Sequence, residues 1–210
     1  MLNYPFRCPH GKFIGRGEIC SEKFFKENHW VHGWALDAYT NTLGKTPYGE
    51  LINAIKYRLQ NDPELAVEKA ELLLSDLKKF LVNLYPIQYR PFDCILYPPS
   101  NTERIFQLME YLANKLASEK VPNRSSEIIK IKRHSTVKSV LGKERTATLI
   151  NSMKLAPDLS RPKPKGILII DDVLETGSTA KELCRALNEV WPGVPRYYVA
   201  LTYLMDWKNK

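Results

Sequence analysis

The sequence predicts an α/β protein in which a parallel sheet is flanked by helices, with an N-terminal cap or hood region ahead of it. From residue 92 onward, short apolar runs of strand length alternate with helical patterns. The apolar run at residues 167–170 leads through a polar loop directly into an amphipathic helix. With 210 residues, 44% of them hydrophobic and 26% charged, the chain has the length and composition of one globular unit with an appended cap.

Two helix starts organise the predicted cap. Thr46-Pro47 and Asp62-Pro63 each place a capping residue before a proline, which is typical of the first helical turn. The second helix shows a core-facing stripe at spacings of three and four: Ala66, Ala70, Leu73, Leu77, Phe80 and Leu84. A break at residues 86–91 then separates a cap at 1–90 from a core at 91–210.

The predicted core consists of strands and helices in alternation. A strand at 92–97 precedes a helix that carries Ile105, Leu108, Met109, Leu112 and Leu116. Then come a strand at 128–131, a short helix near 146–153, a strand at 167–170, a helix with the stripe Ala180, Leu183, Cys184, Leu187 and Val190, and a strand at 197–203. This order favours a parallel sheet with right-handed crossovers.

Apolar runs, cysteine usage and charge indicate where the protein is located and what kind of ligand it binds. No run approaches the roughly 18 apolar residues of a spanning helix, and the N-terminus lacks the apolar core of a secretion signal. The four cysteines are dispersed and suit reduced, buried thiols, so a cytoplasmic protein without membrane partners is expected. Residues 120–165 hold twelve Lys or Arg against three Asp or Glu, a local charge of +9 in a chain of +8. Such focal basicity indicates an anionic ligand.

The polar loop at residues 171–179 reads D-D-V-L-E-T-G-S-T and carries the predicted chemistry. Its glycine, hydroxyls and helix-start N–H groups suit a monophosphate, whereas the two adjacent carboxylates suit hydroxyl donors and a magnesium ion. A ligand with a phosphate beside a diol satisfies both halves. The alternative is an ordinary strand followed by a capped helix with surface carboxylates.

This string resembles the signature with which type I phosphoribosyltransferases bind phosphoribosyl pyrophosphate (PRPP). Within that superfamily the chain is most similar to the ComF-like, competence-associated group, through L-I-N-A-I-K-Y at 51–57 and the basic loop from Lys132 to Arg145. The resemblance implies the type I phosphoribosyltransferase fold. It further implies that Asp171 and Asp172 contact the ribose hydroxyls and hold Mg²⁺, directly or through water, and that PRPP is bound by Asp171, Asp172, Glu175, Thr176, Gly177, Ser178 and Thr179.

The pyrophosphate is expected at the loop 98–104, which falls where this fold places its pyrophosphate loop. Its candidate ligands are Ser100, Asn101, Thr102 and Arg104, although the loop lacks the usual central Lys or Arg. The alternative is that Thr102 caps a helix and Arg104 is solvated. Lys138, Lys143 and Arg145 of the basic loop are further candidates, which would meet the leaving pyrophosphate when that loop closes.

Glu175 departs from the ComF-like pattern, which tends to have Thr at that place. Purine-type transferases carry Asp there, near the base, so Glu175 is the candidate catalytic acid or base beside Asp171 and Asp172. The alternative is a solvent-facing Glu near a helix N-terminus. The expected reaction is phosphoribosyl transfer to a nitrogenous, purine-like base with release of pyrophosphate, and the expected partners are PRPP and a small base or nucleotide.

Other roles stay open from sequence. A non-catalytic ComF-like module that senses PRPP or nucleotides, or binds nucleic acid through the basic loop, is the alternative function. The resemblance also implies a homodimer. ComF-like proteins often have an N-terminal zinc finger, and the candidate ligands are Cys8, His10, Cys20, His29 and His32. Their spacing is poor, so zinc is not expected.

Overall fold

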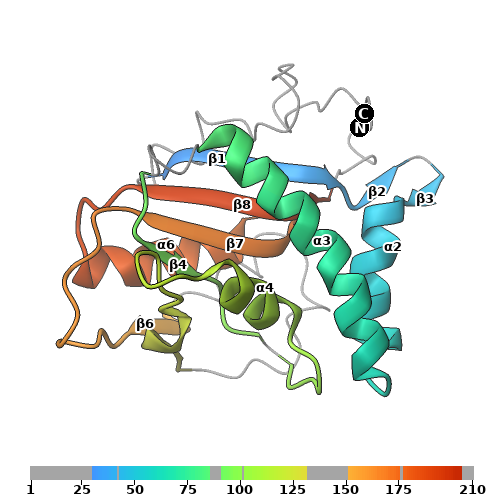
Figure 1. The fold of residues 1–210 in the computed structure, drawn as a ribbon. Coiled ribbons are helices and arrows are strands. Elements are labelled where there is room, and N and C mark those ends of the chain that lie inside the picture. The colour runs from blue at the N-terminus through green and yellow to red at the C-terminus, as the bar shows by residue number, and fades with distance from the viewer. Residues whose placement is uncertain are drawn as a thin grey trace.

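Four parallel strands form the central sheet in a computed structural model of the protein, which describes residues 30–41, 43–85, 91–100, 102–131, 151–175 and 177–204. The strand order is β1-β8-β7-β4 (Figure 1). The strands span Trp30–Ala38 (β1), Cys94–Leu96 (β4), Ile167–Leu174 (β7) and Arg196–Tyr203 (β8). The prediction of an α/β protein with a parallel sheet flanked by helices is confirmed at this level.

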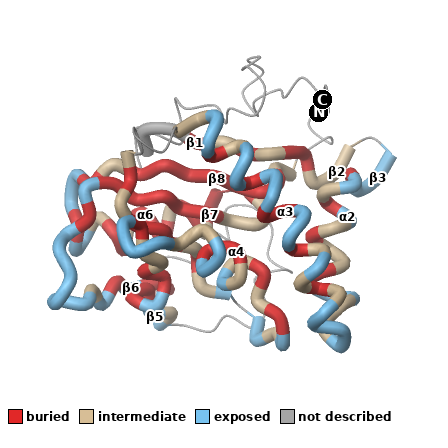
Figure 2. The backbone as a smooth tube through the Cα atoms, in the orientation of Figure 1, coloured by how far each residue is buried: buried red, intermediate tan, exposed pale blue. Residues whose placement is uncertain are grey.

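Helices cover both faces of the sheet (Figure 1). One face packs against α6 (Ser178–Val190), and the other against α3 (Pro63–Leu84) and α4 (Leu108–Leu116). In the first half of β7 the side chains alternate between these layers: Ile167 and Ile169 join the core on the α6 face, whereas Leu168 and Ile170 join the core on the α3 face. β7 and β8 are therefore buried on both sides for most of their length (Figure 2).

The first 90 residues contribute a strand to the same sheet as the rest of the chain. β1 lies beside β8, with Trp30 opposite Arg196 and Ala38 opposite Tyr203. In addition, α3 packs in one core cluster with β7 and β8. Two segments from the first 90 residues thus serve as an edge strand and a covering helix of this sheet. Residues 1–29 lie outside the described residues.

A short hairpin turns the chain back at the carboxyl end of β1. β2 (Thr40–Asn41) pairs with β3 (Gly44–Lys45), and α2 (Pro47–Asn53) follows. Thr46 caps α2 as predicted, since its Oγ1 accepts the N–H of Gly49 at 3.0 Å and donates to the carbonyl of Ala38 at 2.5 Å. Gly49 lies so close to the residue after β1 that a Cβ there would be 2.0 Å from the carbonyl oxygen of Tyr39. These contacts place α2 at the edge of the sheet where β1 ends.

The long helix α3 begins as predicted. Asp62 accepts the N–H of Leu65 at 3.0 Å, and Pro63 occupies the first turn. Most of the predicted stripe is buried; Phe80 and Leu84 are half-buried. The stripe of α6 is likewise buried except at Val190.

Three predicted elements differ from the structure. The helix predicted to include Ile105 begins only at Leu108, and Ile105 is exposed. β5 (Ile128–Lys130), which follows the short helical turn η3 (Ser125–Glu127), pairs antiparallel with β6 (Met153–Leu155) instead of joining the main sheet. Met153, predicted at the end of a short helix, therefore lies in a strand. No helix in the described part of the chain has both the length and the apolarity to cross a membrane.

Candidate functional site

The acidic pair lies at the carboxyl end of β7, with its two side chains on opposite faces of the sheet. Asp171 contacts Tyr198, which belongs to the core on the α6 face, and Asp172 contacts Lys56, whose neighbour Ile55 belongs to the core on the α3 face. Both aspartates are half-buried. The two carboxylates therefore have different neighbours.

Asp171 is held by a neutral hydrogen-bond donor. Its Oδ2 accepts a 2.7 Å hydrogen bond from the hydroxyl of Tyr198, a fully buried residue of β8, and its Oδ1 accepts the N–H of Asp172 at 2.8 Å. Burial raises the pKa of Asp171 to about 7, and the charge of Asp172 adds to the rise, while both hydrogen bonds oppose it. Tyr198 was not singled out from the sequence, because its partner lies on another strand.

Asp172 forms an ion pair with a residue from the N-terminal half of the chain. The Nζ atom of Lys56 lies 2.5 Å from Oδ2 of Asp172, and both side chains are about one-fifth exposed. Burial alone lowers the pKa of Lys56, but the charge and the hydrogen bond of Asp172 raise it above its ordinary value. Lys56 is therefore a protonated cation at the carboxyl edge of the sheet. Lys56 was not predicted as a site residue, although it lies within the segment 51–57 that resembles the ComF-like group.

A π-helical turn presents Lys56. In η1 (Ala54–Arg58), which continues α2, the N–H of Leu59 bonds to the carbonyl of Ala54, five residues back. The carbonyls of Ile55 and Lys56 instead accept hydrogen bonds from the side chains of Gln60, at 2.8 Å, and Arg104, at 3.0 Å. The widened turn thereby anchors the backbone around Lys56 to the loop that follows β4.

Arg104 joins the loop 98–104 to this turn. Its Nη1 donates to Oγ of Ser100 at 3.1 Å, and its guanidinium lies 5.3 Å from the centre of the Tyr57 ring. Ser100 in turn accepts the N–H of Thr102 at 3.2 Å. Thr102 does not cap α4, whose N-cap is Gln107. The structure thus brings Ser100, Thr102 and Arg104 together next to Lys56, as a set of hydroxyl and guanidinium donors.

The start of α6 completes the site. Gly177, the N-cap, has a left-handed φ of 72° and provides no side-chain cap. As in any α-helix, the N–H groups of the first turn point toward the preceding loop. Ser178 is buried, Thr179 is half-buried, and Glu175 is exposed just after β7. This arrangement, a glycine before the N-terminus of a 13-residue helix, can bind a phosphate.

The fit of a magnesium ion depends on the ligand. Mg²⁺ is commonly held by one or two carboxylates together with substrate phosphates and water. Asp172 offers such an oxygen, but the Lys56 ammonium lies against it. Within the described ranges, no group of three or more His, Cys, Asp or Glu could hold a metal. The residues therefore suit a magnesium ion that arrives with the oxygens of its ligand.

Several predicted residues lie outside the described residues. These are Asn101, Thr176, Lys138, Lys143 and Arg145, as well as the zinc candidates Cys8, His10, Cys20 and His29; His32 lies on β1, but its side chain is not described. In the described part of the basic segment, Arg124 is buried and donates to both carboxylate oxygens of Glu127, at 2.7 and 3.0 Å. Arg161 pairs with Asp158 at 3.2 Å. Part of the focal basicity is therefore neutralised within the fold.

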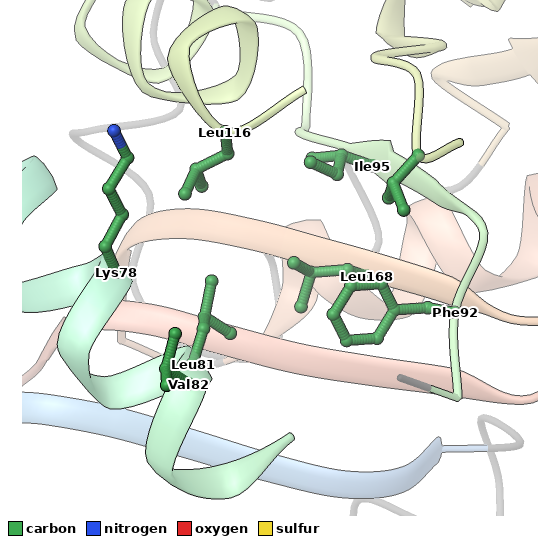
Figure 3. Close-up of a pocket in the computed structure, with 8 residues that line it drawn as sticks. Lys78, Leu81, Val82, Phe92, Ile95, Leu116 and Leu168 are labelled. Carbon is green, nitrogen blue, oxygen red and sulfur yellow. The ribbon is translucent and has the colours of Figure 1, made fainter. Parts of the chain in front are cut away.

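A separate apolar cavity of about 200 Å³ lies between α3, α4 and the sheet (Figure 3). It is lined by Lys78, Leu81, Val82, Phe92, Ile95, Leu116, Val121 and Leu168. Leu168 is near the amino end of β7, whereas Asp172 is near its carboxyl end. Its lining has few polar groups, so this cavity does not suit a phosphate ligand.

In comparisons with known proteins, no family model matches the chain, and no curated protein matches it either. The function of the site is therefore inferred from its own residues.

Proposed function

We propose that the protein binds PRPP at the carboxyl edge of its sheet and transfers the phosphoribosyl group to a nitrogenous, purine-like base with release of pyrophosphate. One observation carries this proposal. The acidic pair at the end of β7 precedes a helix that starts with glycine, and Lys56 and Arg104 are brought to the same edge. Ligands of open parallel sheets bind at this edge.

Each part of PRPP has a counterpart in the site. The N–H groups at the start of α6 and the hydroxyls of Ser178 and Thr179 suit the 5′-phosphate. Asp172 suits the ribose hydroxyls, since a carboxylate accepts from two O–H donors. Ser100 and Arg104 suit the pyrophosphate, because a guanidinium binds phosphate oxygens in pairs.

The fold assignment is part of the proposal. A four-stranded parallel sheet with helices on both faces is compatible with the type I phosphoribosyltransferase fold. The order of the acidic motif, the loop after β4 and the segment 51–57 supports membership in the ComF-like group.

The transfer needs few residues. The nitrogen of the base attacks C1 of the ribose, the C1–O bond to pyrophosphate breaks, and the bonding electrons leave with pyrophosphate. Magnesium bound with PRPP would neutralise part of the pyrophosphate charge. The N–H proton of the base passes to Glu175, which is exposed beside the proposed ribose position. Positioned cations stabilise the departing charge in this scheme, and Lys138, Lys143 and Arg145 are candidates to add to it.

Isothermal titration with PRPP and Mg²⁺ tests binding. We expect the double variant Asp171→Asn with Asp172→Asn to lose binding, whereas Glu119→Gln, on an exposed turn, keeps it. No binding by the unaltered protein, or equal binding by the double variant, would overturn the proposal. A pyrophosphate-release screen across free bases then tests turnover. PRPP binding without release for any base would favour the sensing module instead.

A further inference from the structure

The loop after β4 offers little positive charge for a pyrophosphate. It lacks a Lys or Arg at its centre, and the guanidinium of Arg104 already bonds to Ser100 and to the carbonyl of Lys56 while it lies over Tyr57. A pyrophosphate group that leaves carries several negative charges and needs cations near it. A further cation at this end of the ligand would add to Arg104 and to Lys130, whose Nζ lies 3.4 Å from the carbonyl oxygen of Ser100.

We propose that Lys56 is that cation: it binds the pyrophosphate end of PRPP and leaves Asp172 when the ribose hydroxyls take over that carboxylate. This inference rests on the proposed function, which it deepens by assigning a binding role to a residue outside the motif 167–179. Lys56 belongs to η1, which the hairpin after β1 places at the carboxyl edge of the sheet.

The position of Lys56 between the two halves of the site supports this role. Its Nζ contacts Asp172 at the end of β7, and its carbonyl contacts Arg104 in the loop after β4. The backbone is fixed on both sides of it, because the carbonyls of Ile55 and Lys56 are bonded to side chains of Gln60 and Arg104. A rigid backbone with a flexible four-carbon stem lets the ammonium move between adjacent anions.

Ligand groups can replace each partner of the ion pair between Lys56 and Asp172. Both partners keep about one-fifth of their side-chain surface exposed, so ligand groups can reach them. Hydroxyl groups of a ribose would satisfy Asp172, and phosphate oxygens would satisfy Lys56. The number of charge-assisted hydrogen bonds is then maintained when the ligand enters.

Binding of three ligands distinguishes this role from a structural one. The variants Lys56→Met and Lys56→Gln are titrated with Mg²⁺ and PRPP, with inorganic pyrophosphate, and with ribose 5-phosphate, which lacks the pyrophosphate. Lys56→Gln keeps a hydrogen-bond donor for Asp172 and guards against misfolding of the Met variant. Lys79→Met, on the exposed side of α3, is the matched control, and Lys56→Arg tests rescue by charge.

We expect both neutral variants to weaken PRPP and pyrophosphate binding by about ten-fold or more, which is typical for the loss of a charged hydrogen-bond partner. Binding of ribose 5-phosphate should stay within about two-fold, and Lys56→Arg should recover part of the affinity for pyrophosphate. Unchanged pyrophosphate binding, or an equal loss for ribose 5-phosphate, would overturn the role of Lys56 alone. An unaltered protein that binds none of the three ligands would instead overturn the proposed function itself, and this inference with it.

Discussion

Lys56 and Asp172 form an ion pair although they are 116 residues apart in the sequence. Lys56 comes from the helical segment that follows β1, and Asp172 comes from the carboxyl end of β7. The pair is possible because β1 and β7 run parallel in the same sheet, so the segments that follow both strands lie at one edge. A cation and a carboxylate from opposite halves of the chain thus meet in the candidate site.

We expect PRPP binding to depend on the planar geometry of the Arg104 guanidinium as well as on its charge. Its Nε and Nη1 reach two acceptors, the carbonyl of Lys56 and the hydroxyl of Ser100, and its plane lies over Tyr57. A lysine reproduces the charge but not this geometry. Arg104→Lys should therefore weaken PRPP binding, measured by calorimetry, nearly as much as Arg104→Ala, by roughly five- to ten-fold. Arg58→Lys, on an exposed residue of η1, is the control. Wild-type affinity in Arg104→Lys would contradict the expectation.

Asp37 should make stability depend on pH. It is 4% exposed on β1, and among the described residues its Oδ2 has no hydrogen-bond partner, while Oδ1 accepts the N–H of Ala38. Burial raises the pKa of Asp37 in the folded protein above its usual value, so folding favours the protonated form. Its stabilising contribution is full below the unfolded pKa and is lost as pH rises through the folded pKa.

Asp37→Asn removes this charge and should raise the free energy of unfolding at pH 7 by about 1–2 kcal/mol. The gain should shrink toward zero as pH falls below about 4, where Asp37 is protonated in both states. Urea unfolding at several pH values measures both quantities, with Glu119→Gln as the exposed control. A variant that is less stable at pH 7, or a gain that is constant with pH, would disprove this account.

Gly49 should tolerate no side chain. A Cβ there would be 2.0 Å from the carbonyl oxygen of Tyr39, which is backbone and cannot rotate away. Gly49→Ala is expected to destabilise the protein by about 3 kcal/mol through this overlap, although alanine is otherwise the better helix former. Gly193→Ala is the comparison, since φ at Gly193 is 73° and nothing lies within 4 Å, so only backbone strain of about 1 kcal/mol is expected. Urea midpoints that place Gly49→Ala above Gly193→Ala would refute the close approach.

Removing only one partner of the buried ion pair between Arg124 and Glu127 should strongly lower the free energy of unfolding. Both residues are buried, and Arg124 also donates to the carbonyl of Pro162 at 2.8 Å and stacks on Trp191 at 4.8 Å. Glu127→Ala leaves the guanidinium without its counter-ion and should lower the free energy of unfolding by about 3–4 kcal/mol. Replacing both, as Arg124→Met with Glu127→Leu, should be less harmful than Glu127→Ala alone. Chemical denaturation checks this order, and Lys79→Ala, which removes the exposed pair with Asp76, should change stability by less than about 0.5 kcal/mol.

Local patterns account for what the sequence predicts well. The apolar run before Asp171 and the glycine at 177 indicate a strand, a loop and a helix, because these signals act over a few residues. The opposite faces of Asp171 and Asp172 were not predicted, because both aspartates were expected to contact the same ribose.

Contacts between distant segments account for what it does not predict. The place of β1 beside β8 has no local signal, since it depends on a strand near the other end of the described chain. The π-helical turn around Lys56 is equally hidden, because the side chain of Arg104 from a distant loop helps to satisfy its carbonyls. Lys56 could be suspected only from the missing cation in the loop after β4.

The position of β8 between β1 and β7 has a consequence for how the protein is made. β8 is the last of the four strands along the chain, yet it is the strand through which β1 connects to the rest of the sheet. During synthesis, β1 therefore has no β8 to pair with until nearly all of the described chain has left the ribosome. Such non-local pairing slows folding and leaves an apolar edge strand open to wrong partners in the meantime. Nascent chains that end before Arg196 therefore lack the strand that pairs with β1.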